Sequence, residues 1–498
     1  RKAQEMGRHF TIVTGRDYGA VKSYLEECNL KCECILSNGA EYRDINGNII
    51  ESVYMNKKSV KIAFDILNEA NLCIQLMTNN GSYITNKESD KKAIIDRFKL
   101  FNPTMTEEEV KKFVAKLRQL RKYYRYKVYF PKKYESYCNQ PVQENKVLFL
   151  EMRFTTLSNS FQYLYKKLEE SGEYDLKCSY VQFNFIRGRE FTKRVDDMLQ
   201  ELATAKYVFI DDASLILSSI PLRKETIAIN LWHACGAFKK FGRSTAELKF
   251  GSSAATLDKY PNYENLTHVT VSSPEVIWAY EEAMHLPKGI VKATGVSRTD
   301  LFYDSEFVES RRQKLYEIMP EAKDKKVILY APTFRGHVAT AKSPDKIDFE
   351  RFYQELGDEY VIVCKHHPFV KKPPVIPEEL QHFARDLTKD LSIEDLLCSA
   401  DICISDYSSL VFEYSLFEKP MIFYAYDYDN YCDWRGFYYD YSEFTPGPVV
   451  QTEDELLDSI KNIDTQFDKQ RVIDFKEKFM GSCDGHATER IIELMKES

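Results

Sequence analysis

The chain of 498 residues is long enough for two or three domains, and its 44% hydrophobic and 29% charged content excludes long disorder. Its formal net charge of −7 argues against nucleic acid as the main partner. No apolar run approaches the length of a transmembrane span, so we expect peripheral membrane contact at most. The twelve cysteines lack a zinc-type spacing, and we expect them to be reduced thiols.

The first hundred residues have the pattern of an α/β segment. Residues 9–13 predict a strand that runs into a Thr-Gly-Arg turn at 14–16, and a helix is expected over 17–28. A second strand is expected at 34–36. The Asp and Asn-Gly residues within 44–48 predict a hairpin turn.

With its Thr-Gly-Arg turn, this segment resembles the Cof-type branch of the haloacid-dehalogenase-like phosphatases. The resemblance implies an Asp-x-Asp-Gly-Thr nucleophile motif, which would lie upstream of Arg1, and a later lysine and Gly-Asp-x-x-Asn-Asp metal motif, which we do not find. Phosphoaspartate chemistry needs those carboxylates. We therefore expect a structural remnant, with Thr14 as a phosphate ligand the open alternative.

A basic stretch follows. Residues 111–133 contain ten Lys or Arg and no Asp or Glu, with apolar residues at helical spacing and three tyrosines after them. Cationic and aromatic side chains together suit an anionic membrane surface, where each basic residue contributes on the order of 1 kcal/mol. A solvated linker helix is the alternative interpretation.

A new α/β pattern begins at residue 146. Strands are expected at 147–150, 206–210, 226–231 and 268–271, with helices between them. A charged and mostly helical break at 304–326 precedes a second repeat, whose strands are expected at 327–330, 360–364, 401–404 and 420–424. This alternation predicts two doubly wound parallel sheets with a cleft between them.

The expected fold class is therefore α/β, with a tandem pair of Rossmann-type domains. We place their boundaries at 146–315 and 316–498, behind an N-terminal segment at 1–135. Neither domain carries a Gly-x-Gly-x-x-Gly fingerprint, which argues against a nicotinamide enzyme.

The Ser-Asp-Tyr-Ser-Ser sequence at 405–409 lies between a predicted strand and a helix predicted over 410–417. Unpaired backbone N–H groups, the helix dipole and the hydroxyls of Ser408 and Ser409 converge there, an arrangement that suits phosphate. Ordinary N-capping by Asp406 or Ser408 is the alternative.

His233 closes the strand predicted over 226–231 and precedes a small-residue loop that leads to Lys239 and Lys240. A histidine at a strand's carboxyl end, beside a glycine loop and cations, is placed for proton transfer near an anionic ligand. A packed structural histidine is the alternative.

Two further strand ends carry groups that can donate to phosphate. Thr333 and Arg335 follow the strand at 327–330, and Arg335 offers a bidentate fork. Lys365 and His367 follow the strand at 360–364, whereas His366 is expected to be structural.

The ordered set of motifs resembles a known family. The Trp-His loop at 232–233, the Ala-Pro-Thr-Phe-Arg turn at 331–335, the Lys-His-His-Pro turn at 365–368 and the 405–409 corner are similar to those of the CDP-glycerol glycerophosphotransferases. These are wall teichoic acid primases and polymerases of Gram-positive bacteria. The resemblance covers residue 146 to the C-terminus. Many members have Gly-Thr-Pro where this chain has residues 234–236, Ala-Cys-Gly, which leaves the acceptor open.

The resemblance implies the GT-B architecture and a set of roles. It gives His233 the role of the base that takes the proton from the acceptor hydroxyl. His367 is assigned to the donor's pyrophosphate, with Lys365 adding positive charge. Ser408 and Ser409 are expected to bind phosphate oxygens.

The remaining predicted substrate-binding residues are Lys239, Arg298, Thr333, Arg335, Asp406 and Glu413. Asp406 is expected to orient its loop, because a bare carboxylate beside a diphosphate would repel it. Glu413 is expected to reach a ribose hydroxyl or to point into solvent. For Arg298 the alternatives are contact with the ligand and a pair with Asp300, and the pair is favoured.

The implied reaction transfers glycerol phosphate from CDP-glycerol to a hydroxyl of a lipid-linked, teichoic-acid-like or capsular acceptor and releases CMP. CDP-ribitol as donor, or a GT-B glycosyltransferase that uses a nucleotide sugar, are the alternatives. The implied partners are a polyprenyl-diphosphate glycan or glycerophosphate acceptor and an anionic membrane surface, on the cytoplasmic face. No cofactor is firmly predicted, and Mg²⁺ is left open.

Overall fold

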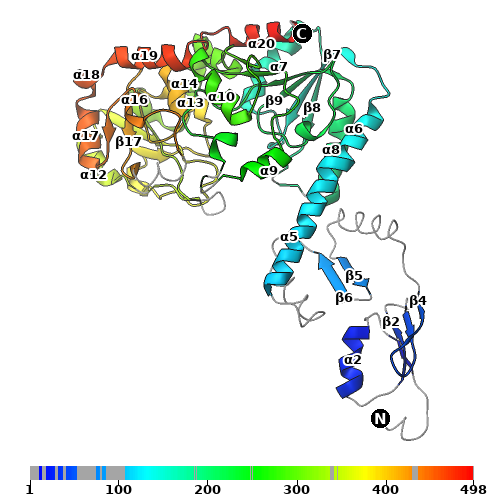
Figure 1. Cartoon of the computed structure of the whole chain (residues 1–498). Coiled ribbons are helices and arrows are strands. Elements are labelled where there is room, and N and C mark those ends of the chain that lie inside the picture. Colours follow the sequence, from blue (N-terminus) through cyan, green and yellow to red (C-terminus); the bar gives the residue numbers. More distant parts are fainter. Residues whose placement is uncertain are drawn as a thin grey trace. The chain divides into compact units, whose positions relative to one another are not determined.

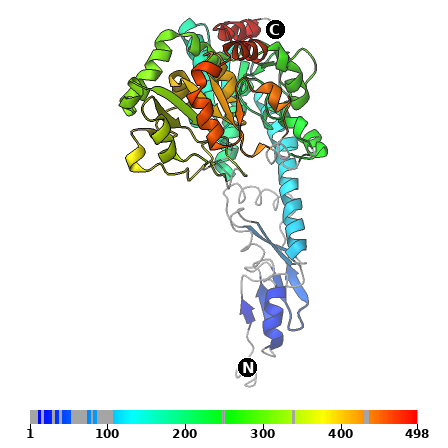
Figure 2. The ribbon, with the colours of Figure 1, turned by 90° about the vertical axis from the view of Figure 1, so that its left-hand side faces the viewer.

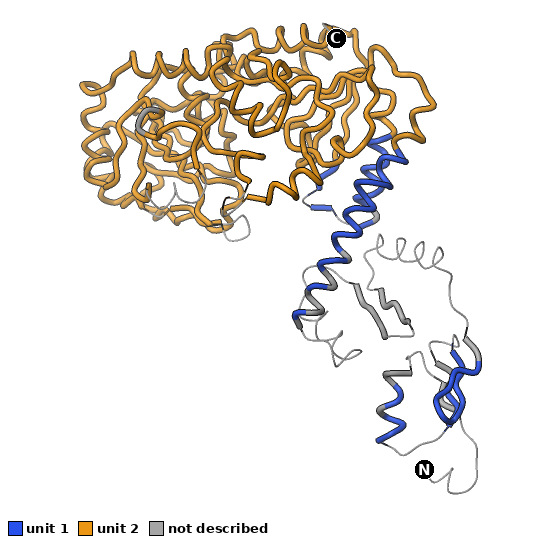
Figure 3. The backbone as a smooth tube through the Cα atoms, in the orientation of Figure 1, with its two compact units in different colours: residues 1–133, 181–199 blue, residues 134–180, 200–498 orange. Residues whose placement is uncertain are grey.

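The computed structural model of the chain describes residues 11–13, 18–27, 32–36, 41–52, 74–78, 81–85, 107–183, 185–186, 188–246, 248, 251–336, 341–344, 346–428 and 436–496. The chain divides into two compact units (Figure 3). Unit 1 comprises residues 1–133 and 181–199, and unit 2 comprises residues 134–180 and 200–498.

Unit 1 begins with a four-stranded sheet in the order β1-β2-β3-β4. Its elements are β1 (Thr11–Val13), α2 (Tyr18–Glu27), β2 (Glu33–Leu36), β3 (Glu41–Arg43) and β4 (Ile49–Ser52), and a separate hairpin is formed by β5 (Ile74–Thr78) and β6 (Gly81–Thr85). The predicted turn between β3 and β4 is present, with the Asp44 carboxylate accepting the backbone N–H groups of Asn46 and Asn48 at 2.8 Å each. The Thr-Gly-Arg turn at 14–16 lies outside the described residues.

The basic stretch is helical, as predicted. It comprises α5 (Glu107–Tyr124), a π-helical segment η3 (Arg125–Tyr129) and α6 (Phe130–Tyr137). Leu120 and Tyr123 of α5 are 56% and 48% exposed. Within the described ranges, no helix combines the length and the apolar character that crossing a bilayer requires.

The first six-stranded sheet of unit 2 has the order β12-β11-β10-β9-β7-β8 and is parallel throughout. Its strands are β7 (Gln143–Glu151), β8 (Asp175–Tyr180), β9 (Ala205–Ile210), β10 (Ile227–Asn230), β11 (His268–Thr270) and β12 (Val291–Lys292). The helices of this half are α7 (Asn159–Ser171), η4 (Leu217–Ser219), η5 (Gly242–Thr245), α9 (Ala254–Lys259), η6 (Pro274–Val276), α10 (Ile277–Met284) and η7 (Ser297–Tyr303), whereas α8 (Gly188–Leu202), which follows β8 in the chain, belongs mostly to unit 1. The near-continuous apolar runs of β7, β9 and β10 are typical of strands buried on both faces.

The second sheet has the order β15-β14-β13-β16-β17-β18 and is also parallel. Its strands are β13 (Lys326–Ala331), β14 (Tyr360–Cys364), β15 (Ala384–Asp386), β16 (Ile402–Ser405), β17 (Met421–Tyr424) and β18 (Val449–Val450). The helices of this half are α11 (Ser305–Ile318), η8 (Pro320–Lys323), α12 (Phe349–Leu356), η10 (Glu378–Leu380), α13 (Ile393–Ser399), α14 (Leu410–Ser415), α16 (Tyr441–Phe444), α17 (Glu453–Lys461), α18 (Ile463–Gln466), α19 (Lys469–Met480) and α20 (Ala487–Lys496). The two sheets confirm the predicted pair of Rossmann-type folds.

The last helix returns to the first sheet. Ile491, Leu494 and Met495 of α20 belong to the apolar core that contains Phe149 of β7 and Phe161 of α7, and α20 lies beside α7 in the ribbon (Figures 1 and 2). This crossing ties the two halves of unit 2 together, because the C-terminal helix completes the core of the N-terminal sheet.

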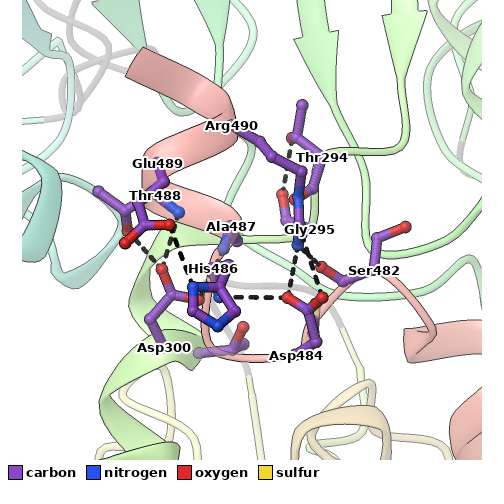
Figure 4. A network of polar contacts seen from close by, with 12 residues as sticks. Thr294, Gly295, Asp300, Ser482, Asp484, His486, Ala487, Thr488, Glu489 and Arg490 are labelled. Carbon is purple, nitrogen blue, oxygen red and sulfur yellow. Dashed lines mark hydrogen bonds and ion pairs between the residues drawn. The ribbon is translucent and has the colours of Figure 1, made fainter. Parts of the chain in front are cut away.

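A polar network fixes the start of α20 (Figure 4). The Asp300 carboxylate accepts the backbone N–H groups of Ala487 at 3.0 Å and Thr488 at 2.7 Å, and the Thr488 hydroxyl at 2.6 Å. Arg490 donates from Nε to the Thr294 carbonyl at 2.8 Å and pairs with Asp484. Asp300 thus satisfies N–H groups at the start of a helix that lies far away in sequence.

Candidate active site

The carboxyl ends of three neighbouring strands bring His233 against a charged cluster. β7, β9 and β10 are adjacent in the sheet, and Arg153, Asp211 with Asp212, and His233 follow them in turn. His233 Nδ1 lies 2.9 Å from the Asp211 carbonyl oxygen. A carbonyl only accepts, so in the neutral ring the proton is on Nδ1 and Nε2 is the proton acceptor.

The residue before His233 has an unusual backbone. Trp232 has φ of 54°, in the left-handed region that a bulky side chain rarely adopts. Its N–H donates to the Asn230 side-chain oxygen at 2.8 Å, which holds the turn. The indole ring is buried, with its centroid 4.5 Å from that of His233. Such strain clusters at functional sites, and here it directly precedes His233.

Part of the His233 side chain is exposed to solvent, but protein atoms surround its ring on most sides. Desolvation lowers its pKa below the ordinary value of 6.5, and the Arg153 guanidinium adds to this effect. Asp212, Asp211 and the hydrogen bond to the Asp211 carbonyl act in the opposite direction. The net result is a neutral imidazole at pH 7, the form that can accept a proton.

A pocket of about 200 Å³ lies in front of His233. It is lined by residues 232–241, by Tyr280 and by Ser409, which belongs to the 405–409 corner of the second sheet. Gly236 makes the close approach possible: it has φ of 63°, and a Cβ there would lie 2.2–2.4 Å from ring atoms of Phe412 in α14. The pocket therefore joins the His233 loop to the predicted phosphate corner.

The second sheet gathers most of the other predicted residues at one edge, because β14, β13 and β16 are neighbours. The Asp406 carboxylate accepts the N–H groups of Thr333 at 2.8 Å and Tyr407 at 2.6 Å. It also pairs with Arg335 at 3.0 Å. Asp406 thus joins the turns after β13 and β16.

Arg335 does not present the open fork that was predicted. Its guanidinium bonds Asp427 from Nε at 2.6 Å and from Nη2 at 2.8 Å, in addition to Asp406. The two carboxylates occupy the geometry that a phosphate would use. Thr333, by contrast, has a buried Oγ1 that makes no hydrogen bond within the described part of the chain.

The phosphate corner differs in detail from the expectation. The helix predicted over 410–417 is α14, Leu410–Ser415, only six residues long, so its dipole is weak. Ser408 Oγ accepts the Leu410 N–H at a long 3.4 Å, and Ser409 lines the pocket.

The two adjacent histidines after β14 have different surroundings. His367 Nδ1 accepts the N–H of Phe369 at 3.1 Å, so in the neutral ring the proton is on Nε2. This is the opposite tautomer from that of His233. His366 is buried and bonds the Ser343 hydroxyl at 2.6 Å, consistent with the structural role expected for it.

Lys365 points its ammonium at the backbone. Nζ donates to the carbonyls of Thr388, at 2.9 Å, and Leu391, and desolvation lowers its pKa. Lys239 lines the pocket, with its backbone bridged to Phe437.

The prediction that Arg298 pairs with Asp300 is wrong. Arg298 is 6% exposed and pairs through Nε with Glu413 of α14 at 2.8 Å, while Asp300 holds α20 instead. Burial alone would lower the pKa of Arg298, but the Glu413 carboxylate outweighs it and raises that pKa. Glu413 is 9% exposed, so of its two predicted alternatives the solvent-facing carboxylate is wrong.

Comparison with known proteins decides the family. Residues 133–497 match the family described as CDP-Glycerol:Poly(glycerophosphate) glycerophosphotransferase. The chain belongs to this family. Residues 1–162 match a haloacid dehalogenase-like hydrolase, which confirms the predicted resemblance of the N-terminal segment.

Relatives within this family are teichoic acid enzymes. A teichoic acid poly(ribitol-phosphate) polymerase of Bacillus spizizenii is 38% identical over 363 residues, which cover 72% of this chain and 57% of that polymerase. A teichoic acid ribitol-phosphate primase of the same organism is 34% identical over 71% of this chain and 92% of the primase. The chain therefore matches little more than half the length of the polymerase.

A solved structure of a wall teichoic acid polymerase shares the fold. The wall teichoic acid polymerase TagF superposes with a TM-score of 0.61 and 22% sequence identity, covering 76% of this chain and 97% of that one. This likeness supports the GT-B-like arrangement of the two sheets.

Sequence reasoning missed the charged cluster under His233. The Asp211-Asp212 pair after a strand was its only local signal, and Arg153 lies 58 residues before Asp211. Among the residues that the structure describes, no group of three or more His, Cys, Asp or Glu side chains is arranged to hold a metal ion.

Proposed function

We propose that this protein transfers an alditol phosphate from a CDP-alditol to a hydroxyl of a lipid-linked, teichoic-acid-like acceptor and releases CMP. The observation that carries the proposal is the pocket that joins His233, from one sheet, to Ser409, from the other. A base and a hydroxyl donor that line the same pocket suit phosphoryl transfer between two bound substrates.

In the proposed reaction the acceptor oxygen attacks the phosphorus that carries the alditol. His233 Nε2 takes the proton of that hydroxyl, since its Nδ1 is bonded to the Asp211 carbonyl. The bond between this phosphorus and the oxygen bridging to CMP breaks, and CMP leaves. His367, with its proton on Nε2, donates to the pyrophosphate and stabilises the charge that develops on CMP.

The donor phosphates have several proposed ligands. Ser408 and Ser409 supply hydroxyls, and the Thr333 hydroxyl is an unused donor at the same edge of the sheet. Lys365 is proposed to add positive charge, although its ammonium is held by backbone carbonyls, whereas the charge of Arg335 is already balanced by the Asp406 and Asp427 carboxylates. Lys239, at the pocket wall, is proposed to meet an anionic acceptor.

Ribitol is the alditol that the relatives favour over the glycerol first predicted. Four relatives with ribitol-phosphate names are 34–38% identical to this chain. Four with glycerol-phosphate names are 27–31% identical. We therefore propose CDP-ribitol as the preferred donor and CDP-glycerol as the second candidate.

The wider setting is also a proposal. Residues 146–315 would form the acceptor domain and residues 316–498 the donor domain. The exposed basic α5 would hold the protein on the anionic cytoplasmic face of the membrane, where a lipid-linked acceptor is found.

The test is CMP release from CDP-ribitol, CDP-glycerol and a panel of nucleotide sugars, with a lipid-linked acceptor, by the wild type and His233→Ala. We expect CMP from a CDP-alditol and a loss of at least about 10²-fold in the variant. His268→Ala, in β11, is the matched control. Turnover of a sugar nucleotide in place of the CDP-alditols would refute the proposal and favour a glycosyltransferase.

A further inference from the structure

A charged cluster beside His233 has no role in the proposed reaction. Ionisable groups from two strand ends meet there: Arg153, 23% exposed, pairs with Asp211 at 3.2 Å and with Asp212 at 3.3 Å. Asp211 is fully buried, and its Oδ2 also accepts the Ser158 hydroxyl at 2.6 Å. Burying charged groups costs desolvation free energy, which favours a role for this cluster beyond holding the fold.

Two contacts run from the backbone of this cluster to the end of β10 and the histidine loop, and a third continues one of them. The Asp211 carbonyl accepts from His233 Nδ1 at 2.9 Å. The Asp212 carbonyl accepts from Asn230 Nδ2 at 3.2 Å, and Asn230 Oδ1 in turn accepts the N–H of Trp232. The backbone of the two aspartates therefore sets both the ring nitrogen and the strained turn that precedes it.

The side chains of the cluster fix that backbone. Arg153 binds both carboxylates, and Asp212 Oδ1 accepts the N–H of Ala213 at 2.7 Å. Glu151, fully buried, accepts the N–H groups of Arg153 and Ser158, at 2.9 and 3.0 Å, which anchors the turn that carries Arg153. Asp211 Oδ1 is buried without a hydrogen bond among the described residues, so Asp211 depends on Arg153 for charge balance.

We propose that Arg153, Asp211 and Asp212 are positioning residues that hold His233 with its proton on Nδ1 and Nε2 toward the acceptor. Their charges also act on the ring, because the Asp212 carboxylate favours the imidazolium and the Arg153 guanidinium disfavours it. The inference rests on the proposed role of His233 as the base. Removing the Asp212 charge makes the imidazolium less favourable, whereas removing the Arg153 charge makes it more favourable.

Other charged and titratable groups surround the same loop. The Arg298 guanidinium lies 3.4 Å from the His233 carbonyl oxygen and 3.8 Å from Cys235 Sγ, and it is balanced by Glu413. Lys239, Lys240 and Tyr280 line the pocket in front of the ring. None of these groups is changed in the Asp212 and Arg153 variants.

The experiment measures His233 directly, by NMR of histidine-labelled full-length protein, with its signals assigned by a His233→Gln variant. The variants are Asp212→Asn, Arg153→Gln and the charge-retaining Arg153→Lys. We expect the Nδ1–H tautomer in the wild type, and a titration midpoint that moves to lower pH in Asp212→Asn and to higher pH in Arg153→Gln. Arg153→Lys should titrate close to the wild type.

The acid limb of the pH–rate profile for CMP release should move in the same two directions. Arg351→Gln and Asp454→Asn are matched controls, because this exposed pair on the second sheet's side of unit 2 changes the net charge equally. Midpoints that stay fixed or move in one direction, or a proton on Nε2, would overturn the inference. If Arg153→Gln does not fold, Asp212→Asn alone decides it. An inactive wild type would refute the proposed function, while the NMR result would still decide the positioning role.

Discussion

The buried pair of Arg298 and Glu413 gives the sharpest prediction about stability. Arg298 belongs to η7, which follows the first sheet, and Glu413 to α14 of the second, and their atoms are 2.8 Å apart. The side chains are only 6% and 9% exposed, so neither charge is well solvated without the other. Arg298→Met leaves a buried carboxylate unpaired, which costs about 3–5 kcal/mol, whereas replacing both partners by apolar residues is close to neutral.

The assay is a double-mutant cycle by urea unfolding of the wild type, Arg298→Met, Glu413→Leu and the double variant. We expect the double variant to be more stable than either single one, with a coupling of roughly 3 kcal/mol or more. Arg351→Met, which breaks an exposed pair, should change the unfolding midpoint little. Additive single effects, or a cost for Arg298→Met below about 1 kcal/mol, would refute the reasoning.

The same pair has a consequence for activity. Arg298 Nη2 also lies 3.4 Å from the His233 carbonyl, so its loss frees the loop that carries the base. Misplacement of a reacting group by about 1 Å can reduce the rate about 10²-fold, so we expect CMP release by the double variant to fall on that scale despite its recovered stability. Recovery of stability together with full activity would show that the pair only holds the fold.

Three further predictions concern the pocket and the donor site. Because desolvation lowers the pKa of His233 and the base must be neutral, activity should rise with pH through a midpoint below 6.5; an acid limb above 6.5 would contradict this. Gly236→Ala should lower the melting temperature and CMP release more than Gly172→Ala, since both glycines have positive φ but only at Gly236 would an added Cβ clash, with the Phe412 ring; equal effects would exclude the steric argument. Thr333→Val should leave stability unchanged and raise KM for the donor by about three- to tenfold, and an unchanged KM would remove Thr333 from the site.

The order of elements and the chemistry at their ends could be predicted from the sequence. Apolar runs of four to six residues followed by polar turns mark buried parallel strands, and eight of the twelve strands of the two large sheets were expected at or near their observed positions. Short edge strands such as β12 and β18, two residues each, carry too little apolar pattern to be detected. The two-sheet architecture followed from alternation alone.

The partners of the charged side chains were decided only by the tertiary structure. Arg298 was expected to pair with its near neighbour Asp300, yet in the folded chain Glu413 of α14, 115 residues away, pairs with Arg298 of η7. Arg335 pairs with Asp427, which lies 92 residues later in the chain. Arg153 pairs with Asp211, 58 residues later, and with Asp212. The sequence by itself determines which groups stand at the strand ends, because hydrophobic periodicity is local. Which of them are bonded to each other depends on which strands and helices pack together, and that is a property of the whole fold.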